Sequence, residues 1–289
     1  MIEYVVHGLL LGSLYALTSL GLVLLFGVTK VINMAHGEIY LLGGYAAYTI
    51  SGVSSPYLGL VTSPFIGFLT GMVIARSLYF PVERLRIPEA DKHMLFIVAT
   101  FGLSTLLQNL MLLIWGAFPV RAELFLSGTV NIFGITMYQQ RFLLVALAIA
   151  TIAVLFIFLF RTKAGLALRA LSQDVETTKA MGVKTDRLYA LNCGIAMSLA
   201  ALGGAVVSPI FWLAPSAGVE LTGKLFAIVI LGGMGSVWGA LLSSLILGVV
   251  ESTSVFFLGQ QWSLVVFFLA MSIVLLIRPT GIFGEERLV

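Results

Sequence analysis

Long apolar runs, each about the length needed to cross a bilayer, occupy most of the chain. A transmembrane helix needs roughly 20 predominantly apolar residues to cross about 30 Å of hydrocarbon. Runs of this kind fall near 4–28, 37–55, 57–75, 94–116, 141–160, 188–213, 223–258 and 262–278. They lack the alternating period of membrane β-strands. The pattern therefore predicts an all-α, polytopic transmembrane helical bundle of about 8–9 spans, forming a single domain over residues 1–289.

The seventh run is too long for one crossing and contains a cluster of glycines. Gly232, Gly233 and Gly235 interrupt residues 223–258. Irregular backbone at membrane depth is tolerated where protein or a cavity surrounds it. We expect either two consecutive helical pieces or a re-entrant half-helix over 223–235 followed by a span.

Glycines at four-residue spacing occur elsewhere in the runs and predict close helix contacts. The pairs are Gly8 with Gly12, Gly67 with Gly71, and Gly235 with Gly239. Small residues four apart let two helix backbones approach closely in lipid. A tightly packed bundle explains such pairs, and a seam between two chains is the alternative.

Composition agrees with a membrane protein and narrows the class. Of 289 residues, 60% are hydrophobic and 10% charged, whereas about 25% are charged in an ordinary soluble domain. The formal net charge of +3 does not indicate a nucleic-acid partner, because in membrane proteins the positions of Lys and Arg matter more than their sum. A lone cysteine, Cys193, lies inside an apolar run and is interpreted as a small buried hydrophobe.

Basic residues gather in three segments between or after the runs. Segments 76–92, 161–187 and 278–287 hold 12 of the 16 Lys and Arg residues. The positive-inside rule places such segments in the cytoplasm. An even number of crossings must then separate them, so the glycine-broken run counts as two. Nine spans with the N-terminus outside and the C-terminus cytoplasmic satisfy this condition.

The residue patterns of common enzymes are absent from the sequence. The three histidines, His7, His36 and His93, have no cysteine or carboxylate at metal-ligand spacing, so no metal or catalytic residue is assigned. The glycine-rich stretch 232–236 is not followed by the lysine of a P-loop, so we expect this chain to bind no ATP or other cofactor itself. We therefore expect a protein that is not an enzyme.

Polar residues in or near the runs are candidates for a substrate pathway, since lipid makes such groups costly. Asn33, His36 and Glu38 lie between the first and second runs. In one interpretation Asn33 caps the second helix, while Glu38 near its N-terminus faces headgroups and water. In the other, these groups line an interrupted helix on the translocation path.

Glu251 is the fourth pathway candidate, near the end of the seventh run. The neighbouring Ser252 and Thr253 leave a second interpretation open, in which Glu251 marks the membrane surface. Glu220 and Lys224 flank the start of the same run, and we interpret them as a surface or snorkelling pair.

The basic segment after residue 161 predicts a short cytoplasmic helix. Ser172 can cap it, Asp174 and Glu176 suit its N-terminal end, and Gly182 can end it in the left-handed conformation. A helix of about nine residues is not stable alone and must dock on something. It is either an amphipathic linker on the membrane surface or a knob that inserts into a partner protein and transmits force to the spans.

Several motifs, in order along nearly the whole chain, resemble one transporter family. They are 12–17 (GSLYAL), 31–38 (VINMAHGE), 165–183 with Arg169, Asp174, Ala180 and Gly182, 231–236 (LGGMGS) and 278–281 (RPTG). The chain is similar to the Liv-type branched-chain amino-acid permeases of ATP-binding-cassette (ABC) importers, specifically to their H-type membrane subunit.

This resemblance implies an assembly in the inner membrane. Its expected partners are an M-type permease, two cytoplasmic ATPase subunits that hold ATP and Mg, and an extracytoplasmic substrate-binding protein. It also implies that the segment from Ser172 to Gly182 couples to the ATPases, with Arg169, Asp174, Glu176 and Ala180 as further coupling residues. Urea and short-amide importers share much of the signature, so urea and short amides are alternative substrates for this chain. From the residues alone, an ion-coupled secondary transporter using Glu38 and Glu251 is a rival of another class.

Overall fold

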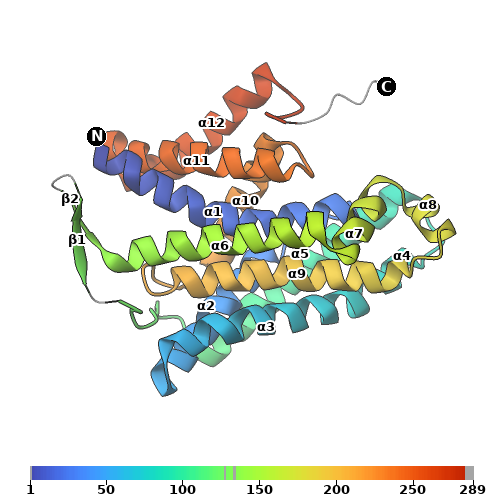
Figure 1. The fold of residues 1–289 in the computed structure, drawn as a ribbon, viewed down its shortest axis with the longest axis horizontal. Coiled ribbons are helices and arrows are strands. Elements are labelled where there is room, and N and C mark those ends of the chain that lie inside the picture. The colour runs from blue at the N-terminus through green and yellow to red at the C-terminus, as the bar shows by residue number, and fades with distance from the viewer. Residues whose placement is uncertain (1, 127, 133–134, 284–289) are drawn as a thin grey trace.

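The computed structural model describes residues 2–126, 128–132 and 135–283. Most long helices run side by side along the length of the molecule (Figure 1). The N-terminus and a small β-hairpin lie at one end, which we call the hairpin end. Helices α4, α7 and α8 lie at the opposite end, which we call the α8 end.

The expected runs form helices close to their predicted positions. The long helices are α1 (Ile2–Thr29), α2 (His36–Val53), α3 (Pro56–Ile74), α5 (Glu89–Trp115), α6 (Gln139–Arg161), α9 (Thr185–Val207), α10 (Ala217–Gly232), α11 (Val237–Leu258) and α12 (Ser263–Ile277). The short ones are α4 (Phe80–Glu83), α7 (Lys163–Gln173) and α8 (Val175–Ala180), with a π-helical turn at Ala75–Tyr79 and a 3₁₀ turn at Gln260–Trp262.

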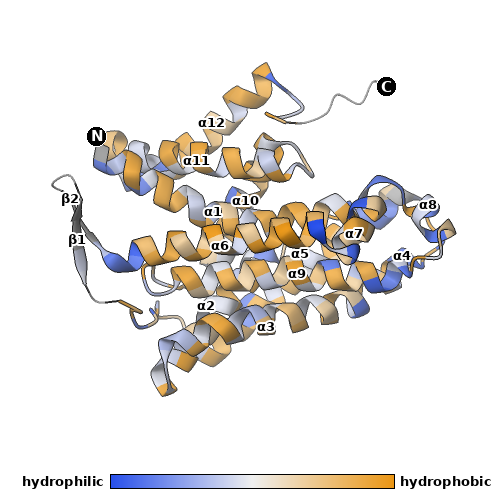
Figure 2. Cartoon of the chain, in the orientation of Figure 1, coloured by the Kyte–Doolittle hydropathy of each residue, from blue (hydrophilic) through white to orange (hydrophobic). Residues whose placement is uncertain are grey.

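Seven helices within the described residues are long and apolar enough to cross a membrane. They are α1, α3 with α4, α5, α6, α9, α11 and α12 with the 3₁₀ turn. Helix α2 carries His36 and Glu38 in its first turn, and α10 has only 16 residues, so neither is among the seven. Figure 2 shows hydrophobic residues along the length of the helices and hydrophilic residues concentrated at the α8 end. The fold is thus a helical membrane bundle, while eight or nine crossings and the orientation stay predictions.

The all-α expectation missed the hairpin. Strands β1 (Thr129–Ile132) and β2 (Ile135–Tyr138) pair antiparallel, with Val130 opposite Met137. The segment between α5 and α6 was assigned to no span, and two strands of four residues give too short a pattern to be told from a loop. The hairpin leads directly into α6, which begins at Gln139.

Glycines break the seventh run as expected. Helix α10 ends at Gly232, and Gly233 and Gly235 adopt φ of +98° and +95°, a region that side chains with a Cβ rarely occupy. Helix α11 then restarts, with the Ser236 hydroxyl accepting a hydrogen bond from the Gly239 amide. The predicted break at the glycines is confirmed, and both alternatives, two consecutive helical pieces and a re-entrant half-helix followed by a span, contain it.

The glycine pairs pack helices of this chain together. A Cβ placed on Gly8 would lie 2.5 Å from the Val249 Cα, and one on Gly248 would lie 2.5 Å from the Gly12 nitrogen. The backbones of α1 and α11 therefore touch. A Cβ on Gly71 would likewise lie 2.4 Å from the carbonyl oxygen of Cys193 on α9. These contacts confirm tight packing within the bundle for the first two pairs.

Candidate functional site

A cavity of about 460 Å³ lies among the helices toward the hairpin end. The N-terminal half of α1 forms one wall, and parts of α2, α6, α10 and α11 form the others, together with the segment 207–213. Much of the lining is aliphatic, including Leu10, Leu11, Leu14, Leu144, Val145 and Leu221. The size and the lining are those of a site for a small, partly apolar molecule.

One wall of the cavity carries an ion cluster. The Lys224 ammonium of α10 lies 2.8 Å from Glu251 Oε1 on α11 and 3.1 Å from Glu220 Oε1, one turn earlier on α10. The Tyr15 hydroxyl of α1 donates a hydrogen bond of 2.8 Å to the other Glu251 oxygen. We call Tyr15, Glu220, Lys224 and Glu251 the ion cluster. It joins helices α1, α10 and α11.

The ion cluster corrects one expectation and refines another. The side chain of Lys224 is only 11% exposed, so the interpretation as a surface or snorkelling lysine was wrong, whereas Glu220 is 56% exposed. Glu251 is 8% exposed and lines the cavity, and its role on the substrate pathway stays a prediction. A Glu and a Lys four residues apart also occur on solvated helices, so spacing alone did not reveal the burial. Tyr15, too, was not predicted as a site residue.

A second polar group also lines the cavity. Arg141, in the first turn of α6, donates a hydrogen bond to the His7 ring on α1. The His7 Nε2 atom also lies 3.8 Å from Glu3 Oε1. Val249, two residues before Glu251, packs against Gly8, the residue after His7. The cavity lining thus contains a basic group on α6 as well as the ion cluster.

The stretch between α1 and α2 is buried, but it lies outside the cavity lining. The Asn33 side-chain oxygen accepts a hydrogen bond of 2.9 Å from the Ala35 amide. Ala35, not Asn33, is the N-cap of α2, so the capping expectation was wrong. The His36 ring meets the carbonyl oxygen of Thr18, and Thr18 does line the cavity. His36 therefore lies directly behind the cavity wall.

Glu38 is fully buried at the start of α2. It accepts a hydrogen bond of 3.0 Å from the Ser104 hydroxyl of α5. A Cβ on Gly218 of α10 would lie 2.2 Å from its Oε2 atom, so the carboxylate is enclosed by backbone. The interpretation in which Glu38 faces headgroups and water was wrong. A role for Asn33, His36 and Glu38 on the substrate path stays a prediction.

The segment predicted to couple to a partner forms two short helices, α7 and α8. Asp174 is the N-cap of α8: its Oδ1 accepts from the Thr177 amide at 3.0 Å, and its Oδ2 accepts from the Thr177 hydroxyl at 2.6 Å. These hydrogen bonds lower the pKa of Asp174 below its ordinary value, and the bond from the Thr177 hydroxyl has the larger effect. Ser172 instead lies in the last turn of α7 and donates to the Arg169 carbonyl, so its predicted capping role was wrong.

The end of α8 agrees with the prediction. Gly182 adopts φ of +79°, and its amide donates to the Lys179 carbonyl at 3.0 Å. Glu176 and Ala180 are exposed, and the Met181 side chain is 80% exposed. The Arg169 guanidinium lies 4.8 Å from the centre of the Phe160 ring, which anchors α7 to the end of α6. A short, capped helix with exposed apolar side chains therefore lies at the far end from the cavity (Figure 1).

Comparison with known proteins assigns the chain to a family. Residues 4–275 match the family described as the permease component of the branched-chain amino acid transport system. The chain belongs to this family. It is 31% identical to the high-affinity branched-chain amino acid transport system permease protein LivH of Salmonella typhimurium, over 99% of this chain and 96% of the relative. No solved structure matches it.

Two further relatives are also described as branched-chain amino acid transport permeases. The permease protein BraD of Pseudomonas aeruginosa is 30% identical over 99% of this chain and 96% of its own length. The probable branched-chain amino acid transport permease protein LivH of Methanocaldococcus jannaschii is 25% identical over 95% of this chain and 90% of its own length. The predicted resemblance is thus confirmed, and the chain is a multi-pass membrane permease of the branched-chain amino acid transport family.

Proposed function

We propose that this chain is the permease subunit of an ATP-driven importer that moves branched-chain amino acids across the inner membrane. Relatives that cover nearly its whole length are described as permeases of branched-chain amino acid transport systems. The position of α8, at the opposite end of the bundle from the cavity, is the observation that carries the proposal of ATP coupling.

Helix α8 has the properties of a docking element. With six residues it is too short to be stable alone, and Asp174 and Gly182 fix its two ends. Its exposed Glu176, Ala180 and Met181 offer a charged and apolar surface to a protein partner. We assign that surface to the cytoplasmic ATPase subunits, where ATP and Mg would bind. Arg169 and Ser172 lie on α7 and would act by positioning α8.

Transport then follows alternating access. Closure of the two ATPases would move α8, and α7 would pass this motion to α6, which lines the cavity at its other end. A second, M-type permease would complete the membrane part, and an extracytoplasmic binding protein would deliver substrate at the hairpin end. Glu251 belongs to the substrate pathway in this proposal, with Asn33, His36 and Glu38 behind the wall.

The experiment is uptake into proteoliposomes that contain the chain with the partner subunits from its own membrane. Uptake of leucine, isoleucine or valine that requires ATP and the binding protein supports the proposal. Uptake of urea or short amides instead would replace the substrate and keep the architecture. Uptake that follows an ion gradient and ignores ATP would overturn the proposal in favour of a secondary transporter.

A further inference from the structure

We propose that the ion cluster recognises the α-ammonium and α-carboxylate groups of a zwitterionic amino acid inside the cavity. This inference rests on the proposed function and adds to it the side chains of this chain that bind the substrate. Lys224 binds the carboxylate, Glu220 binds the ammonium, and Glu251 with Tyr15 holds Lys224 in place.

The geometry leaves capacity for such a ligand. An ammonium group has three N–H donors, and the contacts of Lys224 with Glu251 and Glu220 use two of them. One carboxylate oxygen of Glu220 contacts Lys224, and the side chain is 56% exposed. The neighbouring Lys224 and Glu220 thus offer a donor and an acceptor side by side on one turn of α10. The two charged groups of an α-amino acid are also adjacent.

The charges in the cluster favour a neutral zwitterion over a simple anion. One lysine and two glutamates carry a net charge of −1 when all three are ionised. A zwitterion adds no net charge and gives each ionic group of the protein a partner of opposite sign. A carboxylic acid without an amine would bring a third carboxylate to one lysine, and unpaired charge is costly in a largely buried site.

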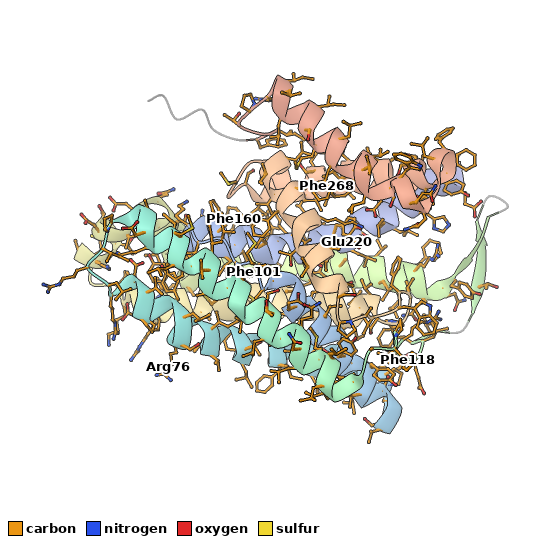
Figure 3. The ribbon with its side chains drawn as sticks, turned by 180° about the vertical axis from the view of Figure 1, so that it is seen from behind. Arg76, Phe101, Phe118, Phe160, Glu220 and Phe268 are labelled. Atoms are coloured by element: carbon orange, nitrogen blue, oxygen red, sulfur yellow. The ribbon has the colours of Figure 1, made fainter. Side chains whose placement is uncertain are left out.

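The surrounding walls suit an aliphatic side chain. Leu10, Leu11 and Leu14 of α1 and Leu221 of α10 line the same cavity as Lys224 and Glu220. Figure 3 shows Glu220 among the helices, whereas Arg76 lies at the outer edge of the molecule. Arg141 and His7 line the same cavity and bond to each other, and within the described residues neither forms a hydrogen bond or ion pair with the ion cluster.

Labelling of a cysteine introduced into the cavity wall reports ligand binding directly. The single cysteine of the chain, the buried Cys193, is first replaced by alanine. Val255→Cys then places a thiol of similar size on α11 in the cavity lining. The control is Phe118→Cys, because Phe118 is 85% exposed and does not line the cavity. The assembled importer is treated with a membrane-impermeant thiol reagent, with and without leucine.

We expect leucine to slow labelling of Val255→Cys and to leave Phe118→Cys unaffected. Isoamylamine, which lacks the carboxylate, and 4-methylvalerate, which lacks the ammonium, should protect at least tenfold less well. Glu220→Gln and Lys224→Gln should each raise the leucine concentration for half-protection at least tenfold. Glu123→Gln, at an exposed site outside the cavity lining, should not.

Equal protection by all three compounds would overturn the inference, as would unchanged protection in Glu220→Gln and Lys224→Gln. Failure of leucine to protect the Val255→Cys thiol, with the ion cluster intact, would overturn it as well. ATP-driven uptake is measured in the same preparations. If ATP-driven uptake persists but leucine does not protect the Val255→Cys thiol, only the proposed recognition site is wrong. If uptake does not depend on ATP, the proposed function itself is wrong.

Discussion

The two ends of the bundle use charged residues in opposite ways. Around the cavity, Lys224 and Glu251 are largely buried and paired with each other. At the α8 end, Asp174 and Glu176 are exposed, and the Asp174 carboxylate holds the backbone of a short helix. Buried charges need partners in a fixed geometry, which suits the small ligand that we propose for the cavity end. Exposed charges are solvated, which suits the protein partner that we propose for the α8 end.

The largest expected effect comes from separating the helices that form the cavity wall. Gly248→Val places side-chain atoms into the backbone of α1 at Gly12, where a Cβ would already lie 2.5 Å from a nitrogen. We expect a loss of about 3 kcal/mol or more in stability and little folded protein, measured by SDS-titrated unfolding. Gly102→Val is the matched control, since a Cβ on Gly102 has no described neighbour within 4 Å. Equal yields for the two variants would contradict the packing described for α1 and α11.

The next largest effect is expected in the ion cluster. Glu251→Gln keeps an acceptor for Tyr15 but removes the charge that faces Lys224 at 2.8 Å. Uptake of leucine should fall at least about tenfold, equivalent to about 1.4 kcal/mol. The importer should still assemble, and its ATPase should still respond to the loaded binding protein. Unchanged uptake in an assembled Glu251→Gln complex would show that the ion cluster has no part in transport.

A change at the opposite end should affect coupling and spare the cavity. Gly182→Leu puts a side chain at φ of +79°, which strains the end of α8 without a steric clash, since no described atom lies within 4 Å of the added Cβ. We expect ATP hydrolysis no longer to respond to the loaded binding protein and no longer to drive uptake, while the protein remains folded in the membrane. Gly116→Leu, also at positive φ and in open space but at the end of α5, is the control. Normal uptake by Gly182→Leu would remove α8 from the coupling path.

The smallest expected effect is the pH dependence of α8. The hydrogen bonds from Thr177 lower the pKa of Asp174 in the folded state. The charged carboxylate therefore stabilises α8 at pH values above the ordinary aspartate pKa, and this stabilisation is lost as pH falls through the lowered value. Protection factors of the amides of residues 175–180, which are corrected for the intrinsic exchange rate at each pH, should fall at acidic pH, and Asp174→Ala should show low protection at all pH values. A helix whose exchange ignores both changes would not depend on this cap.

Much of the fold was predictable from the sequence because membrane-spanning helices need long apolar runs. The glycine break before α11 and the left-handed end of α8 at Gly182 were also predictable, since both follow from backbone freedom that glycine alone supplies. The hairpin at 129–138 was missed, because its strands are shorter than any reliable pattern.

The site residues were harder to predict, for reasons of tertiary contact. Glu251 stood out as a carboxylate in an apolar run, but its partner Lys224 lies 27 residues earlier and looked like one half of a surface pair. Asp174 and Ser172 are both good capping residues, and only the observed break between α7 and α8 decides that Asp174 caps α8. Sequence spacing can rank such candidates, but packing between helices decides which of them meet.

The most direct test of the division between the two ends measures uptake and ATP hydrolysis together in one set of proteoliposomes. Leucine uptake per ATP hydrolysed is compared for the parent chain, Lys224→Gln and Gly182→Leu. We predict that Lys224→Gln keeps hydrolysis that responds to the loaded binding protein but loses uptake, whereas in Gly182→Leu hydrolysis no longer responds to the binding protein. The same response of hydrolysis in both variants would contradict separate ligand and coupling ends.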